Sequence, residues 1–129
     1  MIVATHGAVL ILEDDYFLAT ALAGFVADAG FSVVGPFASM DTAQVMANDQ
    51  GIDAALLDIR LGGDARSFDF ASRLQALRIP FAFVTAYSQS LLPLALQQTP
   101  FLIKPPTRED VAKILQLLLP PPSTRPVAR

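Results

Sequence analysis

Four apolar segments of the 129-residue chain end directly in polar side chains that can take part in metal or phosphate chemistry. A strand buried on both faces reads as such a continuous apolar run and delivers the next residues of the chain to one edge of the sheet. The polar residues are the acids Glu13, Asp14 and Asp15 after segment 8–12, Asp58 after 54–57, Thr85 after 81–84 and Lys104 after 101–103. Each residue alone is weak evidence, but this set on successive strand ends forms a specific pattern.

The acids indicate a divalent cation. Carboxylates that converge without a cation repel one another, which raises the pKa of at least one of them. Magnesium relieves this repulsion, because it favours oxygen ligands and is commonly held by one or two carboxylates plus waters. We expect Asp14 and Asp58 to be direct ligands, and Glu13 and Asp15 to hold coordinating waters or the start of the next helix. The alternative for Asp15 is a helix N-cap without a metal role.

The lysine and the threonine indicate that an anion binds at the same edge. Lys104 ends an apolar strand and precedes a proline, which is an unusual place for a merely solvated lysine. Its ammonium could reach Asp58 or an anion bound there, as a point-charge phosphate binder does. Thr85 offers a hydroxyl donor, and the backbone N–H of Ala86 offers a second donor.

Short apolar runs alternate with longer amphipathic stretches along the chain, and this pattern predicts an α/β fold with a doubly wound parallel sheet. In such a sheet the site lies beyond the carboxyl ends of the strands. The strands are expected at 8–12, 31–34, 54–57, 81–84 and 101–103, and the helices at 16–29, from 39 or 41 to 47, at 66–77, 91–98 and 107–119.

Local signals set several of these limits. Gly35 and Pro36 are expected to stop the second strand. The fourth helix can only be short, and Pro93 must lie in its first turn because proline has no N–H to donate within a helix. Thr107, with Asp110 three residues later, resembles a capping box at the start of the last helix.

Composition and charge narrow the class of protein. The chain is 53% hydrophobic, lacks cysteine and has a net charge of −3, and residues 1–59 contain eight carboxylates without one Lys or Arg. An acidic half without a basic patch argues against nucleic-acid binding. The apolar runs are far shorter than a membrane span. We expect one cytoplasmic domain over residues 7–119, and after it a proline-rich tail at 120–129.

The chain resembles the receiver domain of bacterial two-component response regulators over about residues 7–119. The resemblance is carried by segments 9–15 (VLILEDD), 56–61 (LLDIRL), 83–87 (FVTAY) and 101–105 (FLIKP). It implies a flavodoxin-like sheet with strand order 2-1-3-4-5. The segment after the fourth strand looks most like that of stand-alone receivers with a shortened fourth helix.

The resemblance also implies a phosphorelay function that depends on Mg²⁺. Asp58 would receive a phosphoryl group from a histidine kinase or a histidine phosphotransfer protein. Glu13 and Asp14 would be the acidic pair around Mg²⁺, with Asp58 and the backbone carbonyl of Arg60 as further ligands. Such a protein accepts phosphate and assists its own phosphorylation, but it is not a turnover enzyme.

The same resemblance implies a conformational switch. Thr85 would bind a phosphoryl oxygen when the switch closes, Lys104 would pair with the phosphoryl group, and Phe101 would occupy the position of the switch aromatic. The alternative for Phe101 is a simple core aromatic. The Lys104–Pro105 bond would be cis if the family pattern holds. A downstream protein target would read the switch through direct contact.

Two large residues depart from what an unhindered site requires. Arg60 stands two residues after Asp58, and Tyr87 stands two residues after Thr85, so both flank the expected phosphoryl group. We predict that they hinder an attacking water and slow the hydrolysis of the phosphoaspartate.

Three other functions compete with this interpretation. An aspartate-nucleophile phosphatase needs a second acid two residues after its Asp, where this chain has Arg60. A nucleotide-binding module would need a glycine-rich phosphate loop, and no strand end carries one. A receiver-like interaction module that works without phosphorylation remains open. In the last helix, Leu117 and Leu119 widen the apolar arc, which indicates either a homodimer or partner surface or packing against the preceding loop.

Overall fold

The computed structural model describes residues 7–49, 51–62, 66–86 and 92–120, and these form one five-stranded parallel sheet with order β2-β1-β3-β4-β5. This order and the doubly wound fold class are as predicted. The strands, named in chain order, are β1 Ala8–Leu12, β2 Ser32–Phe37, β3 Ala54–Leu57, β4 Phe81–Thr85 and β5 Phe101–Ile103. Within the described residues, no helix is both long and apolar enough to cross a membrane.

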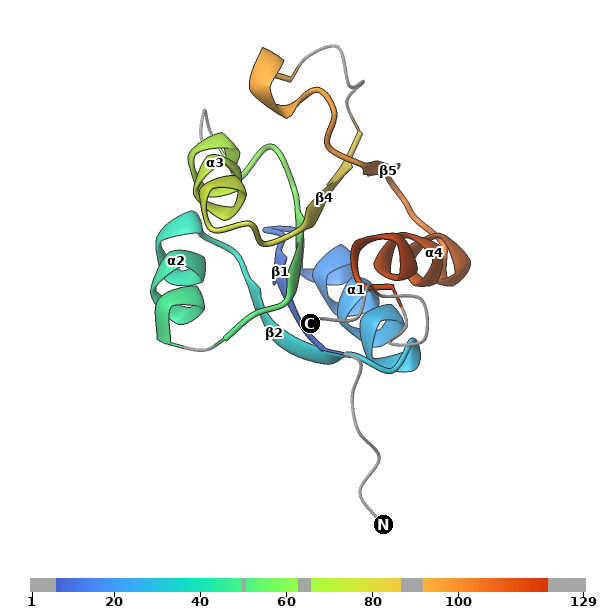
Figure 1. Cartoon of the computed structure of the whole chain (residues 1–129). Coiled ribbons are helices and arrows are strands. Elements are labelled where there is room, and N and C mark those ends of the chain that lie inside the picture. The colour runs from blue at the N-terminus through green and yellow to red at the C-terminus, as the bar shows by residue number, and fades with distance from the viewer. Residues whose placement is uncertain (1–6, 50, 63–65, 87–91, 121–129) are drawn as a thin grey trace, which may run out of the picture.

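Among the described residues, two helices cover each face of the sheet, as can be followed in Figure 1. Helices α1 (Tyr16–Asp28) and α4 (Arg108–Leu118) pack on one face, and α2 (Met40–Asp49) and α3 (Phe68–Ala76) pack on the other. Each face has its own buried apolar cluster, because successive side chains of a strand point to opposite faces. The central strands β1 and β3 are apolar throughout and almost wholly buried, so their ends are fixed in position.

Side-chain caps set the starts of three helices. The Asp15 carboxylate accepts a hydrogen bond from the Leu18 N–H at 3.0 Å, so Asp15 is the N-cap of α1. Of the two candidate caps for α2, the structure uses Ser39, whose Oγ accepts from the Thr42 N–H at 3.2 Å. Thr107 and Asp110 form the predicted capping box of α4. Caps of this kind satisfy backbone donors that the helix cannot satisfy itself.

Strand β2 does not stop at Gly35 and Pro36 as predicted, but continues through them to Phe37. The Gly35–Pro36 bond is cis, and the pairing with β1 shifts register there, from Leu10 opposite Val34 to Leu12 opposite Phe37. Among the described residues, β2 pairs on one side only, and an edge strand tolerates a proline because its outer side needs no N–H donor.

The helical part of the segment before β5 is shorter than the helix predicted for 91–98. In its described part, residues 92–100, the segment contains one 3₁₀ turn, η2 (Leu94–Leu96), and Pro93 precedes that turn instead of lying within it. Pro100 disfavours a helical conformation at Thr99, so a longer helix could not run on into β5. Leu92 and Leu96 are buried against the β4 side of the core, so this short segment still covers the sheet. The shortening of the helix expected between β4 and β5 is therefore confirmed, and the prediction overestimated the length that remains.

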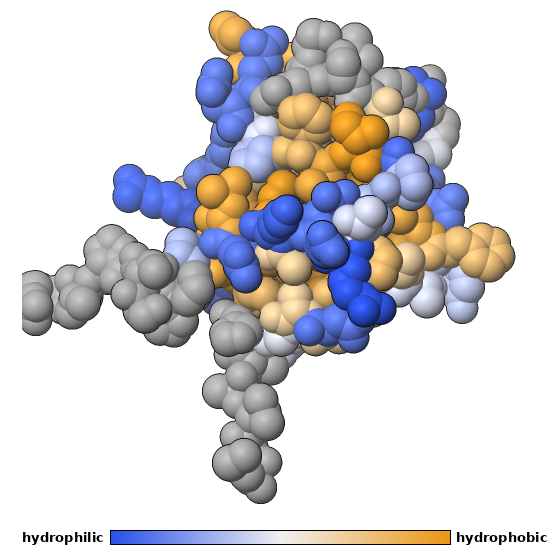
Figure 2. Space-filling model, turned by 90° about the vertical axis from the view of Figure 1, so that its right-hand side faces the viewer, coloured by the Kyte–Doolittle hydropathy of each residue, from blue (hydrophilic) through white to orange (hydrophobic). Residues whose placement is uncertain are grey.

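The apolar surplus on α4 is partly used inside the molecule. Leu118 and Leu119 are half-buried and pack against the core, whereas Leu117 is 66% exposed. Figure 2, which views the side that carries α4, shows hydrophobic residues lying among hydrophilic ones. For Leu119, packing within the chain explains the wide apolar arc. The homodimer surface stays a prediction that rests on Leu117.

Gly35 is expected to tolerate no side chain. Its φ is +105°, and an added Cβ would lie 2.9 Å from the backbone nitrogen of Phe37 and 3.1 Å from the carbonyl oxygen of Ile11. We expect Gly35→Ala to lower the free energy of unfolding by about 1–3 kcal/mol, because strain and close contact with the backbone act together.

Urea unfolding of the variant and the wild type measures this effect. Gly24→Ala is the matched control, because Gly24 lies in α1 with nothing within 4 Å of an added Cβ. Within a helix, alanine is favoured over glycine by about 0.5–1 kcal/mol, so this control should be at least as stable as the wild type. Equal stability of both variants would contradict the interpretation of Gly35.

Candidate functional site

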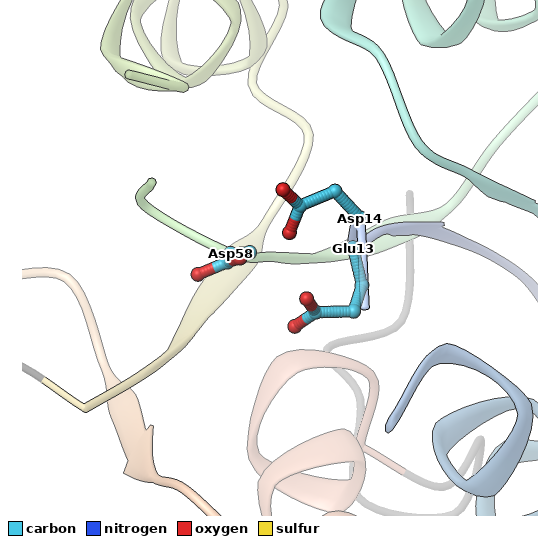
Figure 3. Close-up of side chains that lie close together, drawn as sticks. All are labelled: Glu13, Asp14 and Asp58. Carbon is cyan, nitrogen blue, oxygen red and sulfur yellow. The ribbon is translucent and has the colours of Figure 1, made fainter. Parts of the chain in front are cut away.

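Three carboxylates meet where β1 and β3 end side by side. Leu12 and Leu57 are register partners in the parallel pair, so the residues after them emerge at the same edge of the sheet. A carboxylate oxygen from each of Glu13, Asp14 and Asp58 lies within 4.8 Å of the others. Figure 3 shows Glu13 and Asp14 extending from one strand end toward the side on which Asp58 lies. The predicted acid cluster therefore exists.

The three acids differ in exposure to solvent. Glu13 and Asp58 are only 2% and 5% exposed, whereas Asp14 is exposed. They border a solvent-open hollow of about 340 Å³, whose lining residues are Glu13, Asp14, Asp15, Asp58, Arg60, Gly62, Ala86 and Lys104. A small ligand can therefore approach Asp58 from solvent while the base of its side chain stays fixed in the core.

Lys104 joins the two buried acids from the far strand of the sheet. Its Nζ lies 2.9 Å from Glu13 Oε1 and 3.0 Å from Asp58 Oδ1. Its backbone N–H donates to the Thr85 carbonyl at 2.9 Å, and the bond to Pro105 is cis, as the resemblance implied. The expected approach of the ammonium to Asp58 is thus present. Because this ion pair engages Asp58 through Oδ1, it leaves Oδ2 for other partners.

Burial and ion pairing shift the pKa values of this cluster. Burial raises the pKa of Glu13 to about 7, although the Asp15 N–H and the Lys104 ammonium both favour its charged form. Burial also acts to lower the pKa of Lys104, but the combined attraction of the neighbouring Glu13 and Asp58 carboxylates outweighs burial and raises that pKa above its usual value. The lysine is therefore charged at neutral pH, and the cluster holds more carboxylates than cations.

The donor set fits a hard divalent cation such as Mg²⁺. All three side chains offer oxygen ligands, which Mg²⁺ prefers, and the exposed Asp14 leaves room for the waters that this ion usually keeps. Arg60, whose backbone carbonyl was expected as a further ligand, lines the same hollow. The acidic cluster is thus compatible with Mg²⁺ at the predicted place.

The two candidate switch residues lie at different depths. Thr85 ends β4 and is 2% exposed, and its neighbour Ala86 lines the hollow. Phe101, at the start of β5, is half-buried and packs against the core cluster on the α3 side of the sheet. The structure therefore brings Thr85 next to the hollow but places Phe101 in the partly buried core. Tyr87 lies outside the described residues.

One neighbour of the site and one hydrogen bond within it were missed in the sequence. Gly62 lines the hollow with a φ of +72°, and a Cβ there would lie 3.6 Å from Asp14 Oδ2. The glycine pair after the third strand was the available signal, because a left-handed turn favours glycine. The backbone N–H of Asp15 donates to Glu13 Oε2 at 3.0 Å, and no pattern of residue types indicates that bond.

Searches for a matching protein-family model or a matching curated protein found none. Solved structures, in contrast, match nearly the whole chain. The solution structure of SdrG from Sphingomonas melonis Fr1 shares 36% identity with a TM-score of 0.77, over 92% of this chain and 99% of SdrG. A BeF₃-activated conformation of SdrG from Pseudomonas melonis Fr1 matches at the same identity with a TM-score of 0.76, over the same shares of the two chains.

A longer protein matches over part of its length. The response regulator PhyR from Brucella abortus shares 26% identity with a TM-score of 0.77, over 91% of this chain and 48% of PhyR. These neighbours support a response-regulator role in general, and the acids, threonine and lysine quoted above lie at the strand ends of the shared fold. The chain belongs to the family of response regulator receiver domains.

Proposed function

We propose that this receiver domain accepts a phosphoryl group on Asp58 from a histidine kinase or a histidine phosphotransfer protein, in the presence of Mg²⁺. Glu13, Asp14, Asp58 and the backbone carbonyl of Arg60 would hold the ion. The observation that carries the proposal is Asp58 itself, which lies beside two other carboxylates and 3.0 Å from a lysine ammonium in an open hollow.

The residues of the chain divide the chemistry of transfer among them. An Asp58 oxygen forms a bond to phosphorus, the bond from phosphorus to the donor's imidazole nitrogen breaks, and that nitrogen keeps the electron pair. When bound, Mg²⁺ would neutralise negative charge on the phosphoryl oxygens. Lys104 supplies a second positive charge, and the Ala86 N–H and Thr85 hydroxyl supply donors at the same edge.

The phosphorylated state would differ from the free state in its contacts. Transfer converts a single negative charge into a doubly charged group with several acceptor oxygens. Lys104 and Thr85 would then gain charge-assisted hydrogen bonds worth about 1–3 kcal/mol each. Energies of this size are sufficient to shift a switch between two conformations, with Phe101 as its aromatic member. A downstream protein target would bind one conformation, and a cytoplasmic location stays a prediction.

Intact-mass measurement after incubation with Mg²⁺ and acetyl phosphate tests the proposal. One phosphoryl adduct that requires Mg²⁺ is the expected result, since the donor's phosphorus–oxygen bond breaks and acetate leaves. No adduct would support an interaction module that works without phosphorylation. Steady release of phosphate from added substrates would instead support a phosphatase.

Arg60 and Tyr87 are expected to prolong the phosphorylated state. Arg60 lines the hollow beside Asp58, so its side chain can hinder a water approaching phosphorus. We expect the double variant Arg60→Ala/Tyr87→Ala to lose its phosphoryl group about tenfold faster, which corresponds to about 1.4 kcal/mol in the barrier.

The decay of the adduct, followed by intact mass after removal of acetyl phosphate, measures this rate. Alanine at position 60 keeps the backbone carbonyl that is proposed as a metal ligand. Arg73→Ala on α3 is the control, because Arg73 is exposed and does not line the hollow. A decay rate of the double variant equal to that of the wild type would show that these side chains do not shield the phosphoryl group.

A further inference from the structure

Asp15 links the start of α1 to the acid cluster through two hydrogen bonds. Its carboxylate Oδ1 accepts from the Leu18 N–H at 3.0 Å, which caps the helix. Its own backbone N–H donates to Glu13 Oε2, also at 3.0 Å. The cap holds Asp15 in an extended conformation, with φ −81° and ψ 116°, and this conformation sets the direction of that N–H.

The bond from Asp15 fixes one half of a buried carboxylate. Glu13 is 2% exposed, and its other oxygen, Oε1, pairs with Lys104 at 2.9 Å. Both oxygens of Glu13 are thus held, one by the lysine and one by the backbone of Asp15. Because Asp14 stands between Glu13 and Asp15 in the chain, a change of backbone at Asp15 also moves the exposed acid of the cluster.

We infer that Asp15 is a positioning residue for the cation site, acting through its helix cap and not through its charge. The inference rests on the proposed function, because it assumes that Glu13, Asp14 and Asp58 bind Mg²⁺. Groups that orient metal ligands contribute to affinity without touching the ion, and their loss typically weakens metal binding by about 10–100-fold. The competing explanation is that the exposed Asp15 carboxylate, which lines the hollow, attracts the ion directly.

Three substitutions separate the cap from the charge. Asp15→Ala removes both, whereas Asp15→Asn and Asp15→Ser remove the charge but keep a side chain that caps well. If the cap matters, the alanine variant binds Mg²⁺ about tenfold more weakly than the wild type. The asparagine and serine variants then stay within about threefold of the wild type, because the charge of an exposed group is screened by solvent and salt.

The matched control removes a cap elsewhere. Ser39→Ala abolishes the cap of α2, in which Ser39 Oγ accepts from the Thr42 N–H, and Ser39 does not line the hollow. This variant should lose stability, as a cap deletion does, yet bind Mg²⁺ like the wild type. It shows whether destabilisation alone weakens the site.

Calorimetric titration with Mg²⁺ alone, and hydrogen exchange at the Leu18 amide, are the measurements. Faster exchange at Leu18 together with weaker binding in Asp15→Ala, and neither change in Asp15→Asn, supports the inference. Wild-type affinity for Mg²⁺ in Asp15→Ala overturns the inference. A loss of Mg²⁺ affinity clearly greater than about threefold in both Asp15→Asn and Asp15→Ser also overturns it, because these variants lose the charge and keep the cap. The comparison of the asparagine and serine variants with the wild type remains valid even if the alanine variant does not fold. If the wild type itself binds no Mg²⁺, the proposed cation site fails, and the inference fails with it.

Discussion

Asp58→Asn is expected to abolish phosphoryl transfer to the chain while leaving the chain folded. Asp58 lies at the end of the buried strand β3, 5% exposed, and reaches the hollow with its carboxylate. Asparagine has nearly the same shape, and its amide oxygen can still accept from Lys104. An amide, however, is neither a nucleophile toward phosphorus nor a strong ligand for a hard cation. We expect the rate of adduct formation to fall by more than about a thousandfold, the equivalent of about 4 kcal/mol.

Asp41→Asn is the matched control for this prediction. Asp41 lies exposed in the first turn of α2 and outside the hollow, so the same change of side chain should leave phosphorylation intact. Intact mass after incubation with Mg²⁺ and acetyl phosphate compares the two variants with the wild type. A phosphoryl adduct of normal abundance in Asp58→Asn would place the acceptor on another residue.

Lys104→Met is expected to cause the largest loss of stability at the site. The Lys104 side chain is 22% exposed and pairs with two carboxylates that are 1% and 6% exposed. Methionine preserves the unbranched apolar part of the side chain but removes the ammonium, which leaves two buried acids without their cation. Removing one partner of a buried ion pair typically lowers the free energy of unfolding by about 3–5 kcal/mol, and partial exposure places this case at about 3 kcal/mol.

Mg²⁺ should restore more stability to this variant than to the wild type. A ligand that binds only the folded state stabilises it, and the gain grows with affinity. Without Lys104, the carboxylate cluster has a higher negative charge and should bind a divalent cation more tightly. Urea unfolding with and without Mg²⁺ measures both effects, with Lys113→Met, an exposed lysine of α4, as the control. A variant that is as stable as the wild type without Mg²⁺ would refute the central role given to this ion pair.

The sheet was predictable because four of its five strands are marked by a continuous apolar run with a sharp polar end. Such runs can only be buried between two layers of helices, and parallel strands then bring their ends together. The capping box at Thr107 was readable for the same kind of reason, since it depends on residues three apart. The continuation of β2 past Val34 was not predictable, because glycine and proline more often end a strand than bend it.

The types of the site residues were predictable, but their exact neighbours were not. Spacing after strands placed Glu13, Asp14, Asp58 and Lys104 at one edge, and the structure brings all four together. The sequence could not show that Lys104 joins Glu13 as well as Asp58, because that depends on the path of β5 across the sheet. The bond from the Asp15 N–H to Glu13 depends on backbone conformation, which residue types do not determine.

A crystal structure of the chain grown with Mg²⁺ and beryllofluoride, which mimics a phosphoryl group, tests the central claim most directly. The account predicts one magnesium ion bound directly by Asp14, Asp58 and the Arg60 carbonyl, and held by Glu13 through a coordinating water. It also predicts that the beryllium is bonded to an Asp58 oxygen and that Lys104 and Thr85 contact the fluorines, which stand in for phosphoryl oxygens. A magnesium ion bound away from these carboxylates, or beryllofluoride attached to a different acid, would contradict it.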